Sequence, residues 1–172
     1  MSPEEMVKHL ETVQADGKSA GVDGRDLVMD RYEAVPPSEK SRMVAQLVGQ
    51  VYQVAPPEER TRLIECLLKP LGVLSLAAIA NGIFANIRFH SDWPQRHVRP
   101  EDVQEVQPSD VIALVNSVQE VSLQSIDNLA RLLHGSPAMA GSAAAAVLMT
   151  ILLKRAKNRR ADDLRLQNLS RQ

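Results

Sequence analysis

Apolar residues recur along this chain at the three- and four-residue spacing that places them on one face of an α-helix. The clearest examples are Met6, Val7, Leu10 and Val13, then Val111, Leu114, Val115, Val118 and Val121. No segment alternates between apolar and polar residues over a useful length, and the two Asp-Gly pairs lie between helical patterns rather than between strands. The pattern predicts an all-α protein, a single helical bundle of about seven helices.

Proline pairs mark two of the expected helix starts. Residues 36–48 match residues 56–68 at an offset of 20 positions, and each copy opens with Pro-Pro followed by charged residues and an apolar stripe. Prolines end a preceding helix and fit the first turn of the next one. The match has two interpretations, a duplicated helical unit or independent use of the same helix-start chemistry.

Two long uncharged stretches, residues 71–87 and 138–153, predict two nearly all-apolar helices. A membrane span needs about 20 apolar residues, with a lower limit near 17. One interpretation makes the two stretches the central hairpin of a soluble bundle, with Ala144 packed near Leu74 and Ala78. The alternative is a short helical hairpin inserted in a membrane. The mean hydropathy of −0.18 favours the soluble bundle.

Composition is typical of one globular domain, with 44% hydrophobic and 24% charged residues. We expect the bundle to span residues 1–160 and a polar tail to span residues 161–172. Cys66 is the single cysteine, so the chain cannot form an internal disulfide, and the first residues are acidic rather than apolar. These features predict a cytoplasmic protein, or, if the hairpin inserts, a membrane-associated protein with a cytoplasmic C-terminus.

Charge is concentrated near the C-terminus. Residues 154–172 hold seven basic and two acidic residues, a balance of +5, so the remainder of this −1 chain carries −6. The basic residues predicted to contact an anionic partner are Lys154, Arg155, Lys157, Arg159 and Arg160. The partner would be an acidic protein, a phospholipid or a nucleic acid. The alternative is a solvated helix end whose cations complement the helix dipole.

Chemical motifs are scarce. The sequence holds no phosphate-binding glycine loop, nucleophile elbow or zinc-protease motif, and Cys66 falls within an apolar stripe that predicts a buried thiol. The remaining candidates for metal binding are His90, Asp92 and His97, in the polar segment 90–102. Their spacing is not the one that makes a ready chelate on a helix, so a solvated loop with local salt bridges is the competing interpretation.

The residues therefore predict a non-enzymatic interaction or assembly module without a cofactor, which binds a protein partner or associates with itself. Two alternatives stay open from the sequence alone. One is a membrane-associated protein that inserts residues 71–87 and 138–153. The other is a metal-dependent enzyme centred on residues 90–102.

Overall fold

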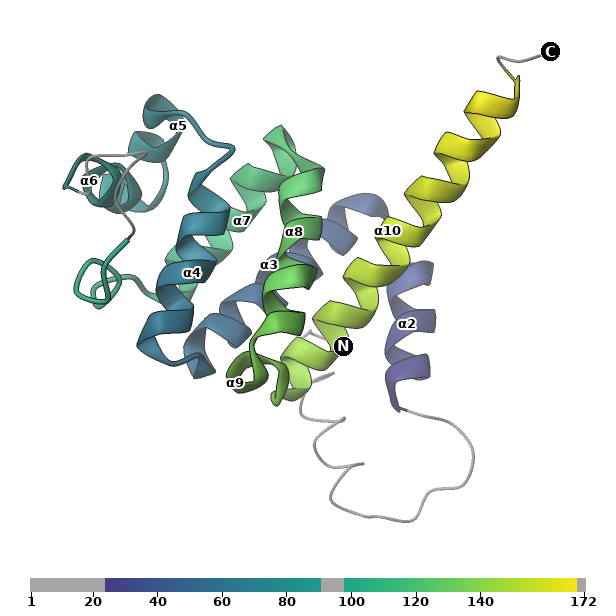
Figure 1. Cartoon of the computed structure of the whole chain (residues 1–172), viewed down its shortest axis with the longest axis horizontal. Coiled ribbons are helices and arrows are strands. Elements are labelled where there is room, and N and C mark those ends of the chain that lie inside the picture. The colour runs from purple at the N-terminus through teal and green to yellow at the C-terminus, as the bar shows by residue number, and fades with distance from the viewer. Residues whose placement is uncertain (1–23, 91–97, 170–172) are drawn as a thin grey trace.

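The computed structural model describes residues 24–90 and 98–169, and every regular element in these ranges is a helix (Figure 1). The elements, in chain order, are α2 (Gly24–Ala34), α3 (Pro37–Val54), α4 (Pro57–Leu68), α5 (Val73–Ala78), the 3-10 turn η1 (Ala80–Gly82), α6 (Ile83–His90), α7 (Pro108–Val121), α8 (Leu123–Gly135), α9 (Pro137–Ala140) and α10 (Ala143–Leu169). The prediction of an all-α bundle is confirmed.

The repeated prolines begin helices as the sequence predicts. Pro36 and Pro56 are the N-cap residues of α3 and α4, both with extended backbone, and the second proline of each pair is the first helical residue. Proline suits this position because its fixed φ is helical and its missing amide hydrogen has no partner there anyway. Serine side chains cap two later helices, since Ser122 accepts from the Ser125 amide and Ser136 from the Met139 amide.

Helix α3 lies in the centre of the bundle and packs against α7 and α10. Its side chains Val44, Val48 and Val51 are completely buried. There is no room for a side chain at Gly49, because a Cβ atom built there would lie 2.7 Å from Cγ1 of Ile112 and 3.2 Å from the carbonyl oxygen of Pro108. The absence of a side chain at Gly49 therefore lets α3 and α7 come together.

The stretch 71–87 is not one helix, so this part of the prediction is wrong. It is divided into α5, η1 and α6, and the break coincides with left-handed backbone at Ala80, Asn81 and Gly82, where φ is 48°, 55° and 80°. Glycine and asparagine adopt this conformation more readily than other residues, and a continuous helix cannot contain it. The asparagine and glycine inside the apolar run are the physical reason for the break.

The two apolar stretches also do not form a central hairpin. Helices α5 and α6 pack on each other at the end of the molecule opposite the protruding part of α10, and Leu74 is 89% exposed (Figure 1). Residues 138–153 divide between α9 and α10, and the second of these packs against α8, α3 and α2. Ala144 is buried in that contact rather than against Leu74 or Ala78.

Neither apolar stretch makes a membrane span in the part of the chain that the structure covers. Among residues 24–90 and 98–169, no helix combines the length and the apolar composition needed to cross a bilayer.

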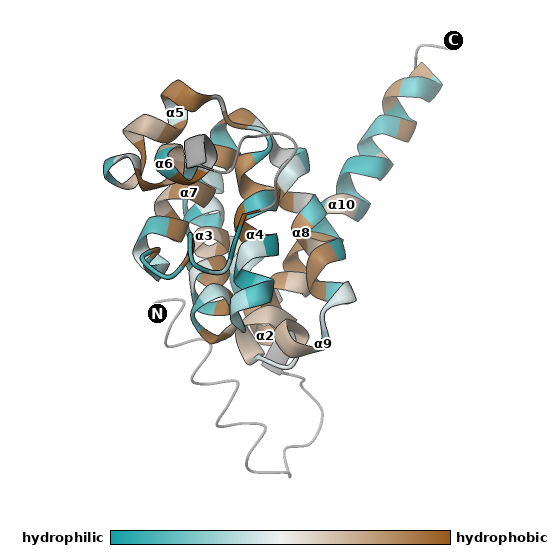
Figure 2. Cartoon of the chain, turned by 60° about the vertical axis from the view of Figure 1, so that its left-hand side comes forward, coloured by the Kyte–Doolittle hydropathy of each residue, from teal (hydrophilic) through white to brown (hydrophobic). Residues whose placement is uncertain are grey.

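The expected boundary between a bundle and a tail at residue 161 does not end the helix. Residues 161–169 continue α10, which extends well past the rest of the bundle (Figures 1 and 2). Figure 2 shows polar and apolar positions alternating along this protruding part of α10. The basic residues 154–160 therefore lie in the middle part of α10.

Candidate functional site

Helix α10 divides the predicted basic cluster into two sets. Lys157 and Arg160 are exposed, whereas Lys154, Arg155 and Arg159 are half-buried. The difference follows from the helical period, because residues 155 and 159 continue the stripe of Leu148 and Leu152 that packs into the bundle. The basic residues of the cluster thus belong to two separate surfaces of α10.

The first surface is the outward face of α10, which we call the outer stripe, formed by Leu153, Lys157, Arg160 and Leu164. These residues are spaced by four, three and four positions, so they lie on one side of the helix. Leu153 is 58% exposed and Leu164 is 61% exposed. Two cations therefore lie between two leucines that are more than half exposed.

The end of α10 is solvent-exposed on all sides. Every residue from 161 to 169 is exposed, including Leu166 and Leu169 (Figure 1). Leu166 and Leu169 lie on the extension of the buried side of the helix, opposite the outer stripe. Large apolar side chains on a protruding helix are typical of a surface that binds another macromolecule.

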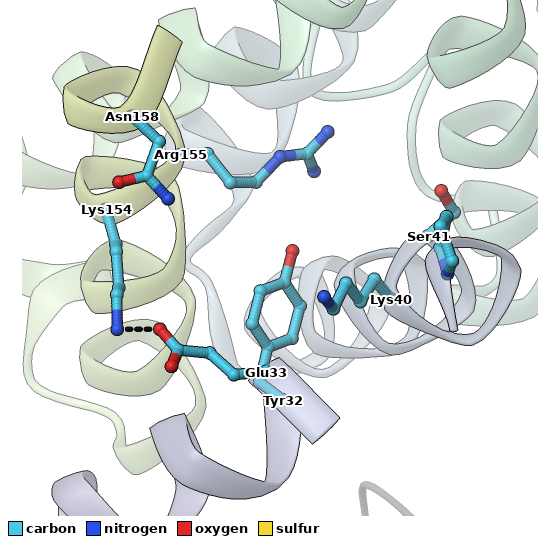
Figure 3. A pocket seen from close by; sticks show the side chains of 8 residues that line it. Tyr32, Glu33, Lys40, Ser41, Lys154, Arg155 and Asn158 are labelled. Atoms are coloured by element: carbon cyan, nitrogen blue, oxygen red, sulfur yellow. Dashed lines mark ion pairs between the residues drawn. The ribbon is translucent and has the colours of Figure 1, made fainter. Parts of the chain in front are cut away.

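The second surface is a pocket of about 320 Å³ between α2, α3 and α10 (Figure 3). Its lining residues are Tyr32, Glu33, Pro37, Lys40, Ser41, Lys154, Arg155 and Asn158. Pro37 is the first residue of α3, so the pocket lies beside the start of a long helix, where the helix dipole favours negative charge.

The electrostatics of the pocket are positive. Lys154 pairs with Glu33, which leaves Lys40 and Arg155 without a carboxylate partner among the described residues. Figure 3 shows the Arg155 guanidinium, the Lys40 ammonium and the Tyr32 hydroxyl turned toward one open space. The Lys40 nitrogen is 5.6 Å from the centre of the Tyr32 ring. Burial raises the pKa of Tyr32, and the positive charge of Arg155 partly opposes the rise.

One donor in this pocket is unused. The terminal nitrogen Nη1 of Arg155 is shielded from solvent and has no hydrogen-bond partner in the described part of the chain. A charged donor that is buried without an acceptor costs free energy, and such groups in folded proteins usually face an ordered water, an ion or a bound molecule.

Sequence reasoning did not identify Tyr32 and Lys40, although a signal for them exists. The 20-residue repeat extends upstream, because Tyr32, Pro36-Pro37 and Lys40 correspond to Tyr52, Pro56-Pro57 and Arg60. The structure gives both copies the same contact, with the Arg60 guanidinium 5.1 Å from the Tyr52 ring centre. Extending the alignment by four residues would have found the pair.

Of the predicted metal ligands, Asp92 and His97 lie outside the described residues, and the structure does not describe the side chain of His90. That prediction stays untested. Within residues 24–90 and 98–169, no three histidine, cysteine, aspartate or glutamate side chains come close enough to hold a metal ion.

The described end of the 90–102 segment is held by hydrogen bonds. The Val98 amide donates to Oε1 of Glu65 at 2.7 Å, and the Arg99 and Asp102 side chains form an ion pair at 2.9 Å. That ion pair is the kind of local salt bridge which the competing interpretation of this segment expects.

Cys66 lies half-buried on α4, packed against the core. Burial raises the pKa of its thiol, and the nearby Lys69 charge only partly opposes this. A raised pKa keeps the sulfur protonated and poorly nucleophilic at neutral pH. The side chain faces the core as the apolar stripe predicts, but it is half-buried rather than buried.

Comparisons with known proteins add no relative: no family model matches this sequence, and neither the curated proteins nor the solved structures contain a match to it.

Proposed function

We propose that this protein is a non-enzymatic interaction module, which binds an acidic partner protein through the outer stripe of α10. The observation that carries the proposal is the combination, on one exposed helix face, of two cations and two leucines that are more than half exposed. A partner helix with apolar residues at its ends and carboxylates between them matches this stripe in both polarity and charge.

The leucines and the cations of the outer stripe would contribute to binding in different ways. Completing the burial of Leu153 and Leu164 would each contribute on the order of 1 kcal/mol. Lys157 and Arg160 would add attraction that speeds encounter with an acidic surface and weakens as salt is raised. Together these contributions fit a moderate, salt-sensitive interaction.

The chemistry of α10 favours a protein over the other two anionic partners. The outer stripe has no aromatic side chain on which a nucleic-acid base could stack. Leu164 and Leu166 lie on opposite sides of the helix, whereas a helix that lies on a membrane gathers its apolar residues on one broad face.

The experiment is photo-crosslinking in the cells that produce the protein. Leu164 is replaced by a photo-reactive phenylalanine analogue, and the matched control carries the same analogue at Leu74, an exposed leucine at the other end of the molecule. We expect a light-dependent adduct from position 164 and none from position 74. The crosslinked segment, identified by mass spectrometry, should be rich in aspartate and glutamate.

The double substitution Lys157→Glu with Arg160→Glu should abolish this adduct, because it replaces attraction by repulsion. Equal adducts at both positions, or none at either, would contradict the proposal. An adduct that contains nucleic acid or lipid would contradict it as well. A crosslink to another molecule of this same protein would show that the partner is a second copy and not a different protein.

A further inference from the structure

The pocket between α2, α3 and α10 has a counterpart inside the protein. In the second copy of the repeat, Tyr52 and Arg60 occupy the positions that Tyr32 and Lys40 occupy in the first. The Tyr52 hydroxyl donates to the backbone carbonyl oxygens of Val103 at 3.0 Å and Val106 at 3.2 Å. The second copy therefore has its acceptors supplied by the chain itself.

The first copy differs in what lies against the tyrosine. The described residues supply no backbone segment there. The Tyr32 hydroxyl opens instead into the pocket of about 320 Å³, beside the Arg155 guanidinium (Figure 3). Each of the two equivalent tyrosine rings thus has a cation beside it, but only the Tyr52 hydroxyl donates to backbone carbonyl oxygens. This difference points to an acceptor that comes from outside the chain.

The charges indicate what kind of acceptor fits. Lys154 is neutralised by Glu33, whereas Lys40 and Arg155 contribute two positive charges that no described carboxylate balances. The shielded Nη1 of Arg155 has no hydrogen-bond partner within the described ranges. Guanidinium groups bind phosphate and carboxylate oxygens through parallel N–H bonds, and a doubly charged oxyanion balances both cations.

We propose that this pocket binds a phosphate-type oxyanion, either inorganic phosphate or the phosphate of a small monoester. This binding is independent of the partner proposed for the outer stripe. Arg155 and Lys40 hold the anion, and the Tyr32 hydroxyl donates a further hydrogen bond to it. A pocket of about 320 Å³ is at the small end of ligand sites, which run from roughly 300 to 1,000 Å³, and it has room for a compact group beyond the phosphate.

The test is calorimetric titration of the full chain with inorganic phosphate, phenyl phosphate and, as a singly charged control, acetate. We expect saturable binding of both phosphates at one site and weaker binding of acetate. Arg155→Met and Lys40→Met should each weaken phosphate binding at least about tenfold, because each removes a charge-assisted contact. Tyr32→Phe keeps the ring and should weaken binding less.

The matched control is Lys157→Met, which removes one positive charge from the same helix but on the outer stripe. It should change phosphate affinity less than about twofold. Circular dichroism checks that each variant is folded, and Lys40→Met on α3 tests the site even if Arg155→Met unfolds. Absence of saturable phosphate binding overturns the proposal, as does an equal loss in Lys157→Met or acetate binding as tight as phosphate. None of these results depends on the partner of the outer stripe.

Discussion

The hydroxyl of Tyr52, on α3, donates a hydrogen bond to the backbone carbonyl oxygen of Val103, 51 positions further along the chain. The same hydroxyl reaches the carbonyl oxygen of Val106. One buried side chain thereby fixes the segment that leads into α7 against the centre of the bundle. We expect Tyr52→Phe to lower the free energy of unfolding by about 1–3 kcal/mol, because the Val106 carbonyl loses the hydroxyl donor and the Val103 carbonyl keeps only the Val106 amide. Urea denaturation measures this loss.

The pH dependence of the same residue gives a second prediction. Burial raises the pKa of Tyr52 from 10.0 to about 12, while the Arg60 charge opposes the rise and the Asp110 charge adds to it. Between these values the unfolded chain loses the proton and the folded protein keeps it, so the contribution of Tyr52 to stability falls as pH rises through this range. The stability difference between the wild type and Tyr52→Phe should therefore shrink from about pH 9 to about pH 11. A difference that stays constant would show that the hydroxyl is not buried in the folded protein.

A side chain added at Gly49 should clash at the contact between α3 and α7. Gly49→Ala would place a methyl group 2.7 Å from Cγ1 of Ile112, and we expect it to destabilise the protein by about 1–3 kcal/mol. Gly135→Ala is the matched control, since no atom lies within 4 Å of the Cβ position there. That control should be neutral or slightly stabilising. Equal denaturation midpoints for the two variants would contradict the close approach of α3 and α7.

The ion pair between Lys154 and Glu33 joins α10 to α2 at the edge of the pocket. Because both side chains are about half exposed, we expect Glu33→Gln to cost less than about 1 kcal/mol in unfolding experiments. The same substitution makes the pocket more positive and should strengthen its binding of phosphate. A loss of stability well above this value would show that the pair holds α2 in place.

The features that depend on local chemistry could be predicted from the sequence alone. The helix starts at Pro37 and Pro57 follow from the fixed backbone of proline. The exposed Lys157 and Arg160 were not separated from the three half-buried cations, because all five were predicted to contact an anionic partner. The break at residues 80–82 was missed because the apolar run around Asn81 dominates the pattern, although left-handed backbone at Asn81 and Gly82 ends the helix.

The pocket could not be predicted, because its residues come from three helices that only tertiary packing brings together. Arg155 was identified as basic, but its half-buried position depends on α2 and α3 packing beside α10. Helical periodicity places a residue on a face, and it does not tell which neighbour covers that face. Tyr32 was not matched to Tyr52 because the repeat was aligned from its prolines onward, four residues after each tyrosine, so the aligned Lys40 was not linked to its ring.

The binding of an acidic partner by the outer stripe is tested most directly by the affinity of the segment crosslinked at position 164. That segment is synthesised as a peptide and titrated into the wild type and into Lys157→Glu with Arg160→Glu, at about 50 and about 200 mM salt. We expect the wild type to bind more weakly at the higher salt concentration. The double variant should bind at least about tenfold more weakly at low salt, with unfolding free energy changed by less than about 0.5 kcal/mol. Equal affinity of the two proteins at low salt would contradict the assignment of the outer stripe as the binding surface.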